Sequence, residues 1–333
     1  MKNLIDVQNL SLKFKTDEGL ITAVDNVSFS IAQGEILGLV GESGSGKSVT
    51  AKSIMRLNPG NAVYSNDTKV FLNLEGQDPI DIMQLKTAKE MKVARGGAIS
   101  MIFQEPMASF APAISIGDQM VEQLLIHTDY NAKQAKKYSI EMLDRVGISD
   151  ADKRFSQFAF ELSGGMRQRA MIAMALSTKP KLLIADEPTT ALDVTIQLQV
   201  IDLMKDLVKE FGMAILFITH DLGVIAQTAD KVAVMYLGKL IEKGEVRDVL
   251  RNPSHPYTQG LIDALPRLDN LDAPLKAIKG DIPSPLERPN GCIFHTRCPK
   301  DMVTACRNIV PDFTALNPKH EAACHLINKE ATS

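Results

Sequence analysis

The segment Gly41–Ser48, with the sequence GESGSGKS, constrains this chain more than any other feature, because it matches the pattern GxxxxGK[ST]. The apolar run Ile36–Val40 precedes it and the helical pattern Ser48–Leu57 follows it, which is the context that a phosphate-binding loop requires. Glycines let backbone N–H groups close around phosphate oxygens, and the following helix adds the partial positive charge of its N-terminus. The segment therefore predicts a site for a nucleoside triphosphate.

The roles of single residues in this loop follow from the same chemistry. We expect Lys47 to reach the β- and γ-phosphates and Ser48 to ligate Mg²⁺. The residues expected to contact the nucleotide are Gly41, Ser43, Gly44, Ser45, Gly46, Lys47, Ser48 and Val49.

A second apolar run, Lys181–Ala185, ends in the acidic residues Asp186 and Glu187. A buried strand that ends in Asp186 would deliver a carboxylate to the Mg²⁺ shell. Glu187 can then polarise the water that attacks the γ-phosphate. Together the two segments predict hydrolysis of the bound nucleoside triphosphate.

The apolar runs of the first 250 residues are continuous rather than alternating, which predicts strands buried on both faces and a largely parallel sheet. These runs are Ile36–Val40, Ala98–Phe103, Lys181–Ala185, Ala214–Ile218 and Lys231–Met235, with further strands predicted over Leu4–Leu10 and Val27–Ile31. Residues from about 105 to 178 carry only helical patterns, which indicates a helical subdomain. The expected fold is an α/β P-loop NTPase domain over 1–250. Residues 251–333 are rich in proline and form an irregular extension that carries all the cysteines.

Composition narrows the class of protein further. The chain has 333 residues, of which 45% are hydrophobic, so it can bury a sizeable core. A net charge of −3 argues against a general binder of nucleic acid or of anionic membranes. No apolar run approaches the roughly 20 residues of a membrane helix, and the N-terminus lacks the apolar core of a signal peptide. We therefore expect a cytoplasmic protein.

The segment Leu162–Arg169, LSGGMRQR, resembles the signature motif of ATP-binding cassette (ABC) proteins. Ser163, Gly164 and Gly165 precede a helix, so a hydroxyl, backbone N–H groups and the helix dipole form a second anion site. In that family this site faces the γ-phosphate held by another nucleotide-binding domain. The resemblance thus implies an ABC-type domain, with ATP sandwiched between two such domains.

Four further positions match the ABC family. Gln104 resembles the Q-loop glutamine, which senses Mg²⁺ and the attacking water, and His220 resembles the switch histidine, which contacts the γ-phosphate. Thr190–Asp193 resembles the D-loop, and Phe14 lies where an aromatic residue usually stacks on adenine. The resemblance implies that the catalytic residues are Glu187, His220 and Gln104, and that Mg²⁺ is contacted by Ser48, Gln104 and Asp186.

The C-terminal part resembles the extension of the dipeptide and oligopeptide transporter ATPases. The matching segments are Asn252–Ile262, Pro289–Cys292 and Arg297–Pro299. Those ATPases are peripheral subunits on the cytoplasmic face of the bacterial inner membrane. They work with a second homologous ATPase, two transmembrane permease subunits and an extracytoplasmic substrate-binding protein. The resemblance implies an ATPase that energises import of di- or oligopeptides, with nickel or di- or oligosaccharides as alternative cargo.

Two parts of this resemblance need separate comment. The family commonly has SLNP after the Q-loop glutamine, whereas Ser109–Pro112 reads SFAP, which affects the expected contact with the membrane subunit. The His-Pro-Tyr element His255–Tyr257 is expected to be structural, because nothing in the sequence places it near the phosphates.

Other classes of ABC protein fit less well. A soluble ABC ATPase acting on nucleic acid or in iron–sulfur assembly is the main alternative, but the acidic charge balance disfavours a nucleic-acid partner. An exporter ATPase is a weaker alternative, because the extension argues against it.

All four cysteines, Cys292, Cys298, Cys306 and Cys324, lie in the extension with the spacing C-x5-C-x7-C-x17-C. A reducing cytoplasm disfavours disulfides, so a metal site is the leading interpretation. Four thiolates could hold Zn²⁺ or an iron–sulfur cluster, and spacing alone favours neither. His295, His320 and His325 also allow a mixed Cys/His zinc site. The resemblance implies a 4Fe–4S cluster, because relatives with this four-cysteine extension carry one.

Overall fold

A computed structural model of the protein describes residues 3–189, 194–265, 277–300 and 303–327. The chain forms two compact units that interleave along the sequence. Among the described residues, the first unit comprises 3–5, 31–35 and 72–217, and the second comprises 6–30, 36–71 and the residues from 218 on. The predicted domain boundary at residue 250 stays a prediction.

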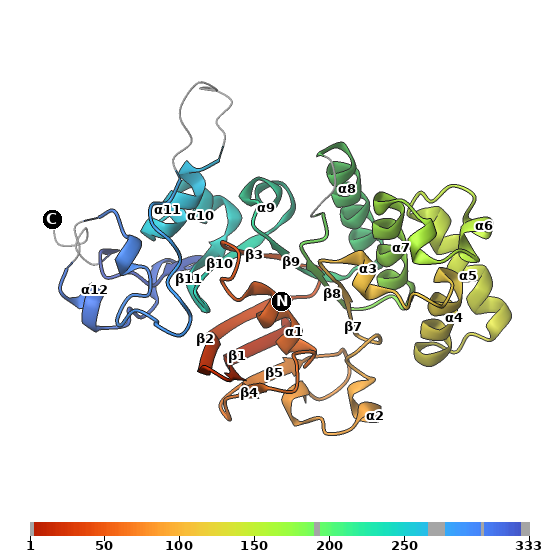
Figure 1. Ribbon diagram of the computed structural model, residues 1–333, viewed down its shortest axis with the longest axis horizontal. Helices are drawn as coiled ribbons and strands as arrows, with labels where there is room; N and C mark the ends of the chain where they lie inside the picture. Colours follow the sequence, from red (N-terminus) through yellow and green to blue (C-terminus); the bar gives the residue numbers. More distant parts are fainter. Residues whose placement is uncertain (1–2, 190–193, 266–276, 301–302, 328–333) are drawn as a thin grey trace. The chain divides into compact units, whose positions relative to one another are not determined.

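The second unit contains the strand that leads into the phosphate loop. Strand β3 (Ile36–Val40) precedes this loop and helix α1 (Lys47–Ile54) follows it (Figure 1). β3 pairs in parallel with β10 (Lys231–Tyr236), and β10 pairs antiparallel with β11 (Lys239–Glu245). Because β3 and β10 are buried along nearly their whole length, their continuous apolar sequences fit a strand covered on both faces.

The extension adds two strands to this sheet. β13 (His320–Ala322) pairs antiparallel with β11, and β12 (Thr314–Asn317) pairs antiparallel with β13. The sequence pattern indicates only irregular structure here, so these two strands are a difference from the expectation. They are three and four residues long, which is too short for a hydrophobic period to be visible.

Among the described residues, the second unit also contains most of a separate sheet and four further helices. Most of β1 (Asn3–Thr16) and β2 (Gly19–Ala32) belongs to it, next to β5 (Lys69–Leu72), and β4 (Ala62–Tyr64) pairs antiparallel with β1. Its remaining helices are α9 (Leu222–Thr228), α10 (Val246–Arg251), α11 (Pro256–Asp263) and α12 (Ala305–Asn308).

The first unit combines parallel strands with a group of helices. β7 (Ile99–Ile102) pairs in parallel with β8 (Leu182–Asp186), and β8 neighbours β9 (Ala214–Thr219). The helices are α2 (Ala88–Met91), α3 (Pro106–Ser109), α4 (Ile116–His127), α5 (Ala132–Arg145), α6 (Ala151–Phe155), α7 (Gly164–Ser177) and α8 (Val194–Phe211); β6 (Ile80–Asp81) is a short further strand. α5 packs against both α4 and α7 (Figure 1).

Local caps explain where the helices of this group begin. The Ser115 hydroxyl accepts from the Asp118 N–H at the start of α4, and Asn131 forms a capping box with Gln134 at the start of α5. The fold is the predicted α/β class. Within the described ranges, no helix is both long enough and apolar enough to cross a membrane.

Candidate nucleotide site

The phosphate loop has a backbone that only glycine adopts easily. Gly41, Gly44 and Gly46 have φ values of 155°, 78° and 99°. A Cβ atom on Gly41 would lie 2.1 Å from the backbone oxygen of Met235, and one on Gly46 would lie 2.7 Å from that of Ala23. The glycines therefore serve both the sharp turns of the loop and its close packing against neighbouring backbone.

The Lys47 side chain lies inside this loop and is buried. Its Nζ donates to the carbonyl oxygens of Gly41, at 2.8 Å, and Glu42, at 3.0 Å. Ser43 and Gly44 are exposed at the tip of the loop, whereas Ser48 and Val49 are half-buried in the first turn of α1 and Ser45 is buried. This arrangement places a cation beside a helix N-terminus, as binding of a triphosphate requires.

In the first unit, strand β8 ends at Asp186 as predicted, and Glu187 follows it directly. Asp186 is buried, and Glu187 is half-buried with a left-handed φ of 47°. The Gln104 amide donates to the Glu187 carboxylate over 3.1 Å. Two of the three predicted catalytic side chains are thus in direct contact, which lets Gln104 orient the carboxylate that would polarise water.

The signature motif forms the start of α7 in the same unit. The Ser163 hydroxyl accepts from the Met166 N–H over 3.4 Å, and Ser163 and Gly164 are exposed while Gly165 is half-buried. The Gln168 side chain donates to the carbonyl of Pro188, so α7 is attached directly to the segment that carries Glu187. An exposed helix N-terminus with a hydroxyl is suited to bind an anion from outside.

The structure also describes the positions of two further predicted site residues, His220 and Phe14. His220 is exposed at the end of β9, and Phe14 is half-buried on β1 opposite Ala62. Thr190–Asp193 lies outside the described residues. Lys47, Ser48 and His220 belong to the second unit, whereas Gln104, Asp186 and Glu187 belong to the first. That all of them meet on one nucleotide stays a prediction.

The His-Pro-Tyr element, which was expected to be structural, contacts the phosphate loop, a position that nothing in the sequence indicated. The Tyr257 hydroxyl accepts from the backbone N–H of Glu42, inside the loop, over 2.8 Å. The Arg297 guanidinium holds the Glu42 carboxylate through both oxygens, at 2.7 and 3.1 Å. Sequence reasoning missed these contacts because they join positions 215 and 255 residues apart.

The four cysteines lie near one another in the extension. Cys292, Cys306 and Cys324 are buried and Cys298 is half-buried, and the Cys292 N–H donates to the Cys306 carbonyl over 2.9 Å. Burial raises the pKa of Cys292 to about 11, and the other three thiols add to that rise. Burial also raises the pKa of Cys298 and of Cys324. Hydrogen bonds from the backbone N–H groups of Phe294, Lys300 and Leu326 lower the pKa of Cys292, Cys298 and Cys324, respectively, but by less than burial raises it.

The described part of the chain contains no group of three or more His, Cys, Asp or Glu side chains arranged to hold one metal ion. The candidate histidines contact other groups. His320 Nε2 lies 2.7 Å from a Glu242 carboxylate oxygen, and the rings of His295 and His325 hydrogen-bond to backbone carbonyls. These contacts do not favour a mixed Cys/His zinc site.

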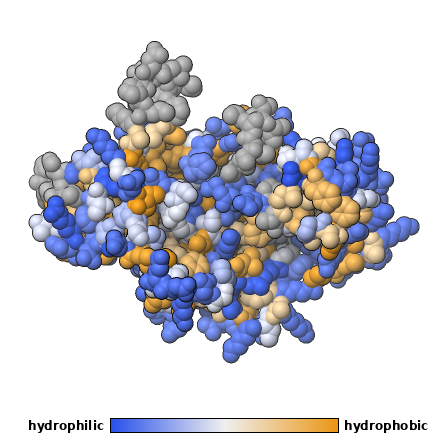
Figure 2. Space-filling view, in the orientation of Figure 1, coloured by the Kyte–Doolittle hydropathy of each residue, from blue (hydrophilic) through white to orange (hydrophobic). Residues whose placement is uncertain are grey.

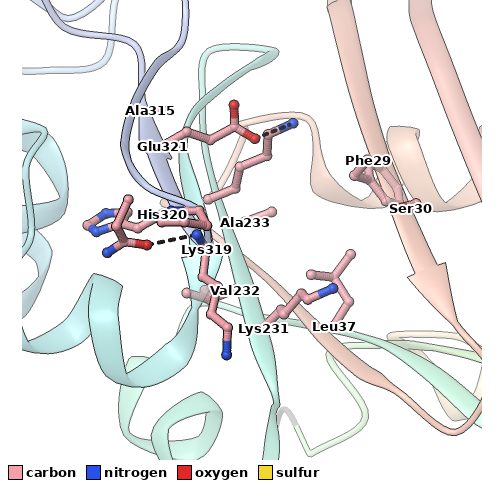
Figure 3. A pocket seen from close by; sticks show the side chains of 14 residues that line it. Phe29, Ser30, Leu37, Lys231, Val232, Ala233, Ala315, Lys319, His320 and Glu321 are labelled. Atoms are coloured by element: carbon pink, nitrogen blue, oxygen red, sulfur yellow. Dashed lines mark hydrogen bonds and ion pairs between the residues drawn. The ribbon is translucent and has the colours of Figure 1, made fainter. Parts of the chain in front are cut away.

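A separate cavity of about 340 Å³ lies between the start of β10 and the β11–β13 edge (Figure 3). Three lysines line it, but Lys243 pairs with Glu321 at 3.2 Å and Lys319 pairs with Glu245 at 2.6 Å. Because these cations already have carboxylate partners, the cavity is a weaker anion site than the phosphate loop.

Comparison with known families finds a match in the N-terminal part of the chain and another in the C-terminal part. A family model described as ABC transporter matches residues 24–190. A second model, described as the oligopeptide/dipeptide transporter C-terminal region, matches residues 241–306.

Individual relatives are similar over nearly the full chain. The dipeptide transport ATP-binding protein DppD of Bacillus subtilis is 45% identical, over 99% of this chain and 97% of its own. The oligopeptide transport ATP-binding protein OppD of Salmonella typhimurium is also 45% identical, over 96% of this chain and 93% of its own. Among solved structures, a dimeric ATP-binding cassette bound to ADP and Pi matches with a TM-score of 0.64 and 25% identity, covering 73% of this chain and 99% of that one. The chain therefore belongs to the ABC transporter family and carries the C-terminal region of the oligopeptide and dipeptide transporters.

Proposed function

We propose that this chain is the ATP-hydrolysing subunit of an importer for di- or oligopeptides. One observation carries the proposal: the likeness to dipeptide and oligopeptide transport ATP-binding proteins covers the phosphate loop, the signature helix and the extension together. A cassette that resembled these proteins only over residues 24–190 would support ATP hydrolysis without indicating a cargo.

The residues of this chain have distinct tasks in the proposed reaction. Lys47 and the loop N–H groups bind the phosphates of ATP, and Ser48 and Asp186 hold Mg²⁺, which neutralises charge on the β- and γ-phosphates. Glu187 takes a proton from the attacking water, and Gln104 keeps its carboxylate in place through the 3.1 Å hydrogen bond. His220 contacts the γ-phosphate.

The signature residues act on a different nucleotide. As in the family that the signature motif resembles, Ser163, Gly164 and Gly165 close over the ATP that the partner ATPase holds, and the exposure of Ser163 and Gly164 leaves this helix N-terminus accessible to such a ligand. Closure of the two domains moves the permease subunits, and hydrolysis followed by product release reopens them.

Substitution of Glu187 tests the catalytic part of this proposal. Glu187→Gln keeps the shape of the side chain but removes the base, so we expect ATP binding to persist while turnover falls by about 10²–10⁴. Lys47→Ala is the matched control, and it should lose ATP binding itself. Turnover of Glu187→Gln within a few-fold of wild type would exclude Glu187 as the general base.

The proposed partners are a second homologous ATPase, two transmembrane permease subunits on the inner membrane and, indirectly, an extracytoplasmic binding protein. The helical part of the first unit offers a surface for the permease. Apolar side chains gather there, seen in orange over α4–α7 in Figure 2. Exposed large apolar side chains of this part of the chain include Met107, Ile114, Leu125, Ile126 and Phe160.

Affinity capture of the tagged chain from detergent-solubilised native membranes tests the partners. Recovery of two multi-span membrane proteins and a related ATPase supports an importer, and the binding protein recovered with them identifies the cargo. Recovery of soluble proteins alone would contradict the transport function and favour a soluble ABC ATPase.

We infer further that the four cysteines hold a 4Fe–4S cluster, which would stabilise the extension. Burial raises the pKa of Cys292, Cys298 and Cys324, so these thiols would need the charge of a bound metal to ionise, and backbone N–H groups two residues further on would then stabilise the thiolates. A four-iron cluster takes one thiolate on each iron, so its sulfur ligands stand farther apart than the ligands of one zinc ion. Zinc held by the same four thiolates is the alternative.

Chemical analysis of the anaerobically purified chain decides between these metals. We expect about four iron and four sulfide per chain, and loss of both in Cys306→Ser. Zinc without sulfide, or neither metal, would contradict the inference.

A further inference from the structure

Glu42 is the second residue of the phosphate loop, and two side chains of the extension hold it from opposite ends of the residue. The Tyr257 hydroxyl accepts from its backbone N–H over 2.8 Å. Arg297 donates to both oxygens of its carboxylate, at 2.7 and 3.1 Å. Both contacts lie within the second unit.

Arg297 is itself fixed by its surroundings. Its side chain is only 4% exposed, and its Nε donates to the Lys279 carbonyl over 3.2 Å. The guanidinium lies over the Tyr236 ring, 5.7 Å from the ring centre. An arginine guanidinium stays protonated in proteins, so its positive charge is permanent. A planar guanidinium that binds both oxygens of one carboxylate fixes direction as well as distance.

Tyr257 is equally well positioned. Its ring packs against Tyr236 and Phe294, with ring centres 4.7 and 5.3 Å away, and the side chain is fully buried. Phe294 lies between Cys292 and Cys298 in the sequence, and Arg297 directly precedes Cys298. The segment that carries two of the cysteines thus packs on the same group that contacts the phosphate loop.

The charge of Glu42 explains why such contacts matter. A carboxylate in a loop that binds a triphosphate would repel the ligand if it were unpaired. Arg297 neutralises that carboxylate and turns it toward the extension. Tyr257 holds the Glu42 N–H, so the first turn of the loop keeps its conformation.

We propose that Arg297 and Tyr257 are positioning residues of the nucleotide site, and that the cysteine-bearing extension thereby sets the affinity for ATP. The proposal rests on the nucleotide site of the proposed function. Neither residue needs to contact the nucleotide, because both act through Glu42.

Nucleotide binding to the purified full-length chain tests this proposal, with Mg-ATP and Mg-ADP titrated by calorimetry well below the unfolding temperature. Arg297→Met should raise both Kd values at least about tenfold, because Glu42 loses its counter-charge beside the phosphates. Tyr257→Phe, which keeps the ring, should raise them about threefold through loss of one hydrogen bond. The double variant Arg297→Met/Glu42→Gln should return to within about threefold of wild type, because the unpaired charge is gone.

A role in stability alone would give a different pattern: a lower unfolding temperature with unchanged Kd values and no rescue by Glu42→Gln. Lys243→Met is the matched control, because it removes a cation from an ion pair with Glu321 elsewhere in the same unit, and its Kd should equal that of wild type. Unchanged binding by folded Arg297→Met, or no recovery in the double variant, would overturn the proposal. If Arg297→Met does not fold, an unchanged Kd for Tyr257→Phe overturns it.

Lys47→Ala separates this outcome from failure of the proposed function. If Lys47→Ala binds ATP as wild type does, the nucleotide site itself is wrong. If it loses binding while Arg297→Met and Tyr257→Phe do not, only the positioning role fails.

Discussion

Glu242 on β11 anchors the start of α11, and we expect its replacement by glutamine to destabilise the protein strongly. The side chain is fully buried. One carboxylate oxygen accepts from the Ser254 N–H at 2.7 Å and from His320 Nε2 at 2.7 Å, and the other accepts from the His255 N–H at 2.9 Å. All three partners donate, so both oxygen positions of the side chain must accept hydrogen bonds.

Glutamine keeps the shape but replaces one oxygen by an NH₂ group. In the less costly orientation this group faces the His255 N–H, so one hydrogen bond to a charged group is lost, at about 1.5–3 kcal/mol. The two bonds that remain become neutral and lose roughly half their strength. The expected loss of stability is therefore about 3–6 kcal/mol, a large part of the roughly 5–15 kcal/mol that is typical of a domain.

Urea unfolding followed by circular dichroism measures this loss, with Glu321→Gln as the matched control. Glu321 lies on the adjacent strand β13 and is 40% exposed in its ion pair with Lys243, so its replacement should cost less than about 1 kcal/mol. If Glu242→Gln loses no more stability than Glu321→Gln, the buried carboxylate does not anchor α11 and the reasoning fails.

Three further predictions concern single sites. Burial lowers the pKa of His255 from 6.5 to about 3, so the unfolded chain binds a proton that the folded chain does not; stability should fall by up to about 1.4 kcal/mol per pH unit below 6.5. His255→Asn, which can still cap α11, should flatten that slope in urea unfolding, and an unchanged slope would assign it to other groups. Gly41→Ala should lower the stability by about 1–3 kcal/mol and abolish ATP binding, because its Cβ would meet the Met235 oxygen. Gly44→Ala has open space around its Cβ and should lower the stability by only about 1 kcal/mol. Thermal unfolding measures both losses, and equal losses would refute the packing explanation. Ser163→Ala should cost under about 1 kcal/mol as an exposed cap and leave ATP binding by the isolated chain intact, yet lower ATPase activity of the assembled transporter; full activity there would remove Ser163 from the second site.

The strands and helices that were predictable have a hydrophobic pattern that is visible in the sequence. β3 and β10 are covered on both faces, so their continuous apolar runs are visible in the sequence, as is the helical period of α8. β12 and β13 were not predictable, because they are short and belong to an edge that only pairing with β11 creates.

The sequence by itself predicts which residues would bind the phosphates, since phosphate chemistry needs a lysine, a hydroxyl and glycines at fixed spacing within one short loop. The resemblance also implied that Gln104 and Glu187 are catalytic, but only the structure shows that the Gln104 amide donates to the Glu187 carboxylate. Only the tertiary structure revealed what holds the loop, because Arg297 reaches Glu42 across 255 residues of sequence. An arginine beside a cysteine has no local pattern that indicates such a partner. The contact exists because the folded extension brings a buried guanidinium to a carboxylate that would otherwise oppose the phosphates.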